Sequence, residues 1–336
     1  MSKPATVATW IAALLWAAGC GDHAAGPADG GDAAMGSSCN PLGSDDCLTP
    51  FPSTAFLEQA ATATGWRVSL VPEVLPVNTE DVPIDPAFWN RLDGFSSATY
   101  VLAYFPEGVD AGDLPPLGDP AQSLEATSPT VIVEVPSGER VPHFAEIDAN
   151  AKKDEDYRQG LILRPVVRLK AGSRYAVGLK RSLGPAIPPG FQAILDGTPS
   201  GNPTLERLRP DYDAIFNALG KAGLAREDLL LAWDFYTASD GTFVEPMQAM
   251  VGEALDAVPT ITYVVDGVND YASGDTLRVV TGTFEVPNFL GADGYISDPP
   301  EPDGVFTAEF TVLIPRAAEN GPLPVLLFGH GIFGSG

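Results

Sequence analysis

The chain contains 336 residues, with 44 Asp and Glu against 19 Lys and Arg, which gives a formal net charge of −25. So acidic a surface would repel nucleic-acid phosphates and anionic lipid head groups, and no nucleic-acid partner is expected. The 35 Gly and 32 Pro favour short strands and many turns, the hydrophobic fraction of 45% can form buried cores, and the length predicts two domains.

The first twenty residues are typical of a secretory signal. One cation precedes an apolar stretch, and small residues lead to Cys20. The stretch is shorter than the roughly 20 apolar residues that cross a bilayer. Ala18-Gly19-Cys20 resembles the lipobox of bacterial lipoproteins, although Ala17 stands where that motif usually has leucine. The resemblance implies a signal peptide over 1–19, lipidation of Cys20, and anchoring to the bacterial cell envelope, on its periplasmic or outer side. Plain secretion is the alternative.

Residues 20–38 are predicted to be a flexible tether, because Ala, Gly, Asp and Ser offer almost nothing to bury. Cys39 and Cys47 follow. In an oxidising compartment these two cysteines are expected to form a short-loop disulfide at the start of the first domain. No histidine lies near them in the sequence, so no metal site is expected there, and no cofactor is expected for the chain.

Residues 39–258 are predicted to form a β-rich domain with inserted helices. Alternating and continuous apolar runs predict strands, with 164–169 and 175–179 joined as a hairpin around a Lys-Ala-Gly-Ser turn. The other predicted strands are 99–105, 130–135 and 229–237. The segment 164–177 resembles a strand pair of bacterial Ig-like domains, and this resemblance implies a β-sandwich.

Two helices are predicted within the same domain. Tyr212, Ile215, Phe216 and Leu219 follow helical spacing between Pro210 and two later glycines. Further on, Thr242-Phe243-Val244-Glu245 matches a capping box. The apolar stripe that follows it is expected to pack in a core, and it consists of Val244, Met247, Val251, Ala254 and Leu255.

Residues 259–336 begin a second strand-rich block, with strands predicted over 260–265, 277–286 and 305–314. The loops between them are rich in Asp, Gly and Pro, which raises the question of calcium binding. None matches the twelve-residue calcium loop with its fixed glycine and final glutamate. Solvated turns are therefore the favoured interpretation.

The run Pro324-Val325-Leu326-Leu327-Phe328 predicts a strand buried on both faces of a parallel sheet. It leads into Gly-His-Gly-Ile-Phe-Gly at 329–334, whose glycine spacing matches the dinucleotide-binding fingerprint. However, the bulky His330 stands where the backbone should approach a pyrophosphate, and an exported chain meets little soluble nicotinamide cofactor. The competing interpretation is an oxyanion loop, in which free backbone N–H groups face a developing negative charge.

Residues 324–334, PVLLFGHGIFG, look like the His-Gly strand and loop of bacterial lipases and esterases. The resemblance implies that the Ile332 N–H donates to the oxyanion, while His330 and Gly331 shape the turn. The segment 224–235 also resembles the N-terminal region of exported bacterial lipases. Together these two segments imply a serine hydrolase that acts on an ester or lipid substrate.

The chain has no Gly-x-Ser-x-Gly nucleophile motif, and its histidines are His23, His143 and His330. In α/β-hydrolases the catalytic histidine follows the nucleophile, so none of these three can serve. We therefore expect an inactive N-terminal part of a longer enzyme. The expected fold is mixed α and β and multidomain, with an Ig-like β-sandwich region with inserted helices followed by the first strands of an incomplete α/β-hydrolase domain. The alternative is a non-enzymatic surface lipoprotein with an Ig-like binding or spacer domain.

Overall fold

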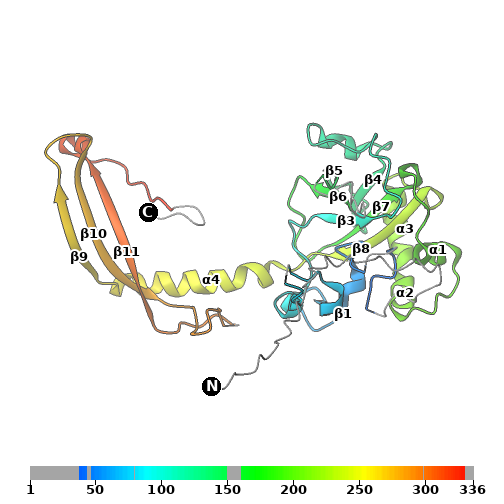
Figure 1. Cartoon of the computed structure of the whole chain (residues 1–336), viewed down its shortest axis with the longest axis horizontal. Helices are drawn as coiled ribbons and strands as arrows, with labels where there is room; N and C mark the ends of the chain where they lie inside the picture. The colour runs from blue at the N-terminus through cyan, green and yellow to red at the C-terminus, as the bar shows by residue number, and fades with distance from the viewer. Residues whose placement is uncertain (1–37, 44–46, 79, 150–159, 298, 330–336) are drawn as a thin grey trace, which may run out of the picture. The chain divides into compact units, whose positions relative to one another are not determined.

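The computed structural model describes residues 38–43, 47–78, 80–149, 160–297 and 299–329 (Figure 1). It confirms a mixed α and β chain with several antiparallel sheets. Among the described residues, no helix has the length and apolar character needed to cross a membrane.

Two three-stranded antiparallel sheets lie in residues 38–238. The first has the order β4-β7-β8 and comprises β4 (Thr130–Val135), β7 (Arg174–Lys180) and β8 (Leu229–Tyr236). The second has the order β3-β6-β5 and comprises β3 (Val101–Tyr104), β6 (Gly160–Pro165) and β5 (His143–Ile147). A small pair joins β1 (Leu57–Gln59) to β2 (Trp66–Val68). Residues of both larger sheets contribute to one hydrophobic core.

Three short helices accompany these sheets: α1 (Pro189–Asp196), α2 (Pro203–Leu208) and α3 (Tyr212–Lys221). Helix α3 packs against β4, β7 and β8. Gly178 of β7 allows this close approach, since a Cβ there would lie 3.0 Å from a methyl carbon of Leu219 in α3. On β8, Trp233 is buried and donates its indole N–H to the Pro52 carbonyl over 2.9 Å. Helix α3 and the strands β3, β4, β7 and β8 confirm the sequence predictions.

The predicted hairpin between 164–169 and 175–179 is wrong. β6 ends at Pro165, because proline has no N–H to continue a ladder. β6 pairs with β3 and β5, whereas β7 pairs with β4 and β8, so the two strands belong to different sheets. The turn between them therefore carries the chain from one sheet to the other.

Helix α4 (Asp240–Ala257) corrects two further predictions. Thr242 lies inside its first turn, so the predicted capping box does not form. The carboxylate of the buried Asp93 caps the helix instead, accepting from the Ser239 N–H at 3.0 Å and the Thr242 hydroxyl at 2.6 Å. The apolar stripe expected in a core is exposed: 58% for Met247, 48% for Val251 and 64% for Leu255.

A separate three-stranded antiparallel sheet has the order β11-β10-β9, formed by β9 (Tyr263–Asp270), β10 (Thr276–Pro287) and β11 (Val305–Pro315). It confirms the three strands predicted after residue 259. Cross-strand partners share a face of an antiparallel sheet. One face is therefore apolar, and its members include Tyr263, Val265, Val268, Val280, Phe284, Val286, Phe306, Phe310 and Val312. The opposite face is mixed, with Thr and Glu side chains beside Val264, Val279, Val305 and Leu313.

The hydrophobic core of the described chain is formed by its N-terminal part alone. All fully buried hydrophobic side chains of the described residues fall between Leu42 and Ala238. By contrast, Tyr263 and Phe306 on the apolar face of the β9–β10–β11 sheet are 71% and 58% exposed. Residues 38–238 therefore carry a core of their own, whereas the described residues from 240 to 329 do not.

Candidate functional site

The residues proposed for the oxyanion loop, His330, Gly331 and Ile332, lie outside the described residues, as does the proposed lipidation site Cys20. The segment leading into the loop is described as far as Gly329. The buried strand predicted there is not formed by the described residues, because 324–328 adopt no strand in this structure. Val325 and Leu327 are 96% and 97% exposed, since the described residues offer no parallel strand for this segment to pair with.

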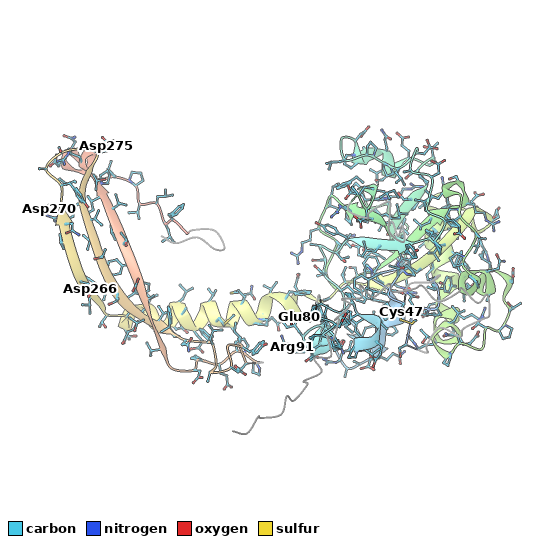
Figure 2. The ribbon with its side chains drawn as sticks, viewed as in Figure 1. Cys47, Glu80, Arg91, Asp266, Asp270 and Asp275 are labelled. Atoms are coloured by element: carbon cyan, nitrogen blue, oxygen red, sulfur yellow. A yellow bond between two sulfur atoms is a disulfide. The ribbon has the colours of Figure 1, made fainter. Side chains whose placement is uncertain are left out.

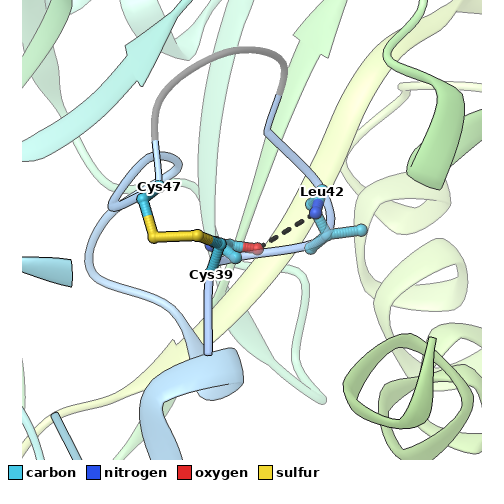
Figure 3. The surroundings of a disulfide bond; sticks show 4 residues. Cys39, Leu42 and Cys47 are labelled. Carbon is cyan, nitrogen blue, oxygen red and sulfur yellow. Dashed lines mark hydrogen bonds between the residues drawn. A yellow bond between two sulfur atoms is a disulfide. The ribbon is translucent and has the colours of Figure 1, made fainter. Parts of the chain in front are cut away.

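Cys39 and Cys47 form the disulfide that their spacing suggested (Figure 3). The bond has a Cα–Cα distance of 4.4 Å. Inside the loop, Asn40 is buried, donates to the Pro50 carbonyl over 2.7 Å and accepts from the Leu42 N–H over 3.1 Å. Leu42 is only 1% exposed. The disulfide therefore secures a segment that fills the core and leaves neither sulfur as a free thiol.

The most buried ion pair of the described residues joins Arg174 of β7 to Asp234 of β8. The Arg174 Nε lies 2.7 Å from Asp234 Oδ2, with side-chain exposures of 14% and 5%. A longer contact of 3.7 Å joins Arg174 Nη2 to Asp211. The guanidinium also lies 5.6 Å from the centroid of the Tyr236 ring. Sequence reasoning missed this pair, although a lone aspartate within the apolar run of β8 is a signal for a buried partner.

Burial and charge act in opposite directions on this pair. Burial raises the pKa of Asp234, while the Arg174 charge and hydrogen bond counteract it. Burial alone would lower the pKa of Arg174, but the neighbouring Asp234 carboxylate leaves it raised. Arg174 and Asp234 are paired with each other, with the buried Arg174 Nη2 left without a hydrogen-bond partner, and neither side chain lines the two hollows described below. The arrangement joins β7 to β8 and has no geometry for acid–base chemistry.

His143 is the histidine that the structure describes, and it is fully buried. Its Nδ1 lies 2.9 Å from the Val141 carbonyl, and its Nε2 lies 2.9 Å from the Thr130 hydroxyl. Burial lowers the pKa of His143 to about 4. A side chain so enclosed cannot reach a substrate, so His143 is not a catalytic base in this structure.

The acidic stretch around β9 carries several aspartates, the residue type that binds calcium. Figure 2 shows Asp266 and Asp270 along β9 and Asp275 beyond its end. Asp270 forms a two-point ion pair with Arg278, at 2.5 and 2.9 Å, and the Arg278 hydrogen bond lowers the pKa of Asp270. Within the described ranges, no group of three His, Cys, Asp or Glu side chains is placed to hold a metal.

Two open hollows lie on the described surface. One, of about 260 Å³, is lined by Arg181, Gln192, Asp196, Arg226 and Glu227, among others. Another, of about 350 Å³, lies between residues 107–110 and 183–186. The Arg226 side chain of the first hollow already has protein partners: it donates to the Leu195 carbonyl at 2.6 Å and stacks on Phe216. Neither hollow brings a nucleophile to a base.

Comparisons of the chain with protein-family models, with curated proteins and with solved structures found no match.

Proposed function

We propose that the chain is the N-terminal part of an exported, lipid-anchored serine hydrolase of the lipase/esterase type, acting on an ester or lipid substrate. In this proposal residues 39–258 form an Ig-like region ahead of the catalytic domain, which begins near residue 259. The nucleophile, the acid and the catalytic histidine belong to polypeptide that follows Gly336. The lipase-like run at 324–334 is the observation that carries the proposal.

The exposed state of residues 325–328 supports this assignment. These four side chains are 78–97% exposed, although Val, Leu and Phe are strongly favoured in buried parallel strands. The segment is therefore available to enter a sheet supplied by further polypeptide. The Gly-rich loop would then follow the buried strand directly, as an oxyanion loop requires.

In the complete enzyme the Ile332 N–H would face the oxygen that becomes negative during acyl transfer. A second donor would come from the residue after the nucleophile. His330 and Gly331 would shape the turn and take no part in proton transfer. Such donors act through their fixed geometry, and loss of one typically reduces turnover by roughly 100- to 1000-fold.

The coding sequence beyond Gly336 gives the first test. A Gly-x-Ser-x-Gly after a strand, followed by Asp and then His, is the expected result. A stop codon or unrelated repeats would contradict the enzyme proposal. The 336-residue chain itself is expected to hydrolyse p-nitrophenyl esters no faster than buffer, and turnover that a serine-directed phosphonate abolishes would show that its catalytic residues are already present.

The role of Ile332 can be tested in the longer protein. Ile332→Pro removes the backbone N–H and should lower kcat on p-nitrophenyl esters by about 100-fold or more. Ile332→Val retains the N–H and should stay close to the parent enzyme. Equal rates for the two variants would exclude Ile332 as an oxyanion donor.

The lipid anchor is tested by metabolic labelling with a palmitate analogue in a bacterial host. The label should be incorporated by the parent chain and be lost in Cys20→Ser. Labelling that survives this substitution would contradict anchoring at Cys20. Cys39→Ser is a poor control here because it breaks a disulfide, so Ser37→Ala serves instead.

A second candidate function is a non-enzymatic surface lipoprotein. The self-contained core between Leu42 and Ala238 favours it, because a body complete in itself can serve as a binding or spacer module. The coding-sequence test separates the two candidates.

A further inference from the structure

The chain passes from one sheet of the body to the other at His143. Residues 139–141 lie beside β4, with the Val141 N–H donating to the Ile132 carbonyl at 2.8 Å. Two residues later His143 starts β5, whose partner is β6 in the other sheet. The imidazole reaches back to β4 through Thr130. His143 therefore stands at the crossover and joins the two sheets by a side-chain hydrogen bond.

The hydrogen bonds fix the tautomer of this histidine. The Val141 carbonyl can only accept, so the Nδ1 carries the proton and donates to it over 2.9 Å. The Nε2 is then the acceptor for the Thr130 hydroxyl, also at 2.9 Å. The His143 N–H donates to the Ser123 hydroxyl over 2.9 Å. All three side chains are buried, so water cannot replace these bonds.

Protonation would disturb this arrangement in two ways. The Nε2 would lose its lone pair and could no longer accept from Thr130. A positive charge would also enter a fully buried site, where an unpaired charge is strongly unfavourable. No carboxylate of the described elements around the ring offers compensation, and the charge that acts on it is the repelling guanidinium of Arg140.

The other charged groups on the packed elements are occupied elsewhere. Glu146 of β5 pairs with Arg164 of β6 at 2.6 Å, and Glu134 of β4 pairs with Lys170 at 2.6 Å. Lys180 of β7 donates to the Ala126 carbonyl at 2.6 Å. Arg140 itself donates to the Ser123, Glu125 and Ala222 carbonyls. Glu125 follows the turn at Ser123 and Glu139 begins the segment that runs to β5; both are exposed, and Glu139 lies 3.7 Å from Lys170.

We propose that His143 is an acid-sensitive latch: neutral, it holds the crossover segment 139–147 and the turn at Ser123 against β4, and protonation releases them. The ordinary pKa of histidine, 6.5, falls to about 4 in the folded chain through burial. Because the unfolded or opened form binds the proton more readily, the closed form loses stability as the pH falls from 6.5 toward 4. This difference corresponds to a change on the order of a hundredfold in the closing equilibrium.

Hydrogen exchange at pH 7 and pH 4.5, corrected for the intrinsic rates, tests the latch in the full chain. Amides of 139–147 should lose protection at the lower pH by tenfold or more, while those of α3 and β8 change less. His143→Gln keeps hydrogen-bonding capacity but cannot titrate, and should abolish the acid-dependent difference. His330→Gln is the matched control and should behave like the parent. Equal acid sensitivity in His143→Gln and the parent would overturn the proposal.

A measurement without any substitution guards against a variant that fails to fold. Long-range ¹H–¹⁵N spectra of the imidazoles should show His143 as the neutral Nδ1–H tautomer down to about pH 5, well below the ordinary histidine pKa of about 6.5. Titration of His143 near pH 6.5 would overturn the proposal.

Discussion

At the scale of single residues, the buried pair of Arg174 and Asp234 makes the sharpest prediction. Arg174→Met leaves the Asp234 carboxylate buried without its partner, which should reduce the free energy of unfolding by about 3–5 kcal/mol. The double variant Arg174→Met, Asp234→Leu removes both charges and should recover much of that loss. Urea unfolding at pH 7 provides the measurement.

A surface ion pair gives the matched control for this prediction. Arg168 and Asp240 lie 2.7 Å apart, as close as the buried pair, but their side chains are 62% and 65% exposed. Arg168→Met should therefore change stability by no more than about 1 kcal/mol. Similar losses for Arg174→Met and Arg168→Met would show that burial does not set the strength of these pairs.

At the scale of elements, the same change, glycine to alanine, is predicted to lower the stability of the fold in one helix and to raise it in another. In α1, a Cβ on Gly190 would lie 1.8 Å from the Pro41 carbonyl oxygen, a backbone atom of the disulfide-closed segment. Gly190→Ala must displace that segment and should cost roughly 1–3 kcal/mol. In α3, Gly220 is exposed with open space around it, and Gly220→Ala should stabilise by about 1 kcal/mol.

Thermal unfolding of the two variants checks this pair of predictions. The melting temperature should fall for Gly190→Ala and rise for Gly220→Ala. A rise in both would mean that helix propensity outweighs the contact with Pro41, and that the 39–47 segment is not held against α1.

The same scale shows what could be predicted from the sequence. Strands β4 and β8 and helix α3 follow from local apolar periodicity, which needs no knowledge of partners. The partners of β6 and β7 could not be predicted. Strands that follow each other in the sequence are expected to pair, and apolar periodicity does not indicate which sheet a strand joins. The cap of α4 was missed because its carboxylate comes from Asp93, almost 150 residues earlier in the sequence.

The candidate site likewise has one part that the sequence predicts and another that it does not. The disulfide was predicted from two cysteines in a chain that we expect to be exported, and the structure forms it. The apolar sequence of 324–328 predicts a buried strand. A strand of a parallel sheet forms only when neighbouring parallel strands are present, and the described residues supply no such neighbour. Its apolar side chains are consequently exposed, and the oxyanion assignment of Ile332 remains a proposal from sequence.

At the scale of the whole molecule, stability is predicted to reside in residues 38–242. The fully buried hydrophobic side chains of the described chain end at Ala238, and Thr242 completes the cap that Asp93 forms. Burial of apolar surface is the main stabilising term in folding. A shortened chain of residues 38–242 should therefore unfold in urea at nearly the same midpoint as residues 38–329.

Tryptophan fluorescence can report on this unfolding in both chains, because neither contains a tryptophan after Trp233, which is 1% exposed in the core. The longer chain should in addition bind an apolar dye through its exposed side chains at 325–328 and on the β9–β10–β11 sheet. A clearly lower midpoint for the shorter chain would mean that residues 243–329 contribute to the core of the body. In that case the assignment of this region to a separate domain near residue 259 would be wrong.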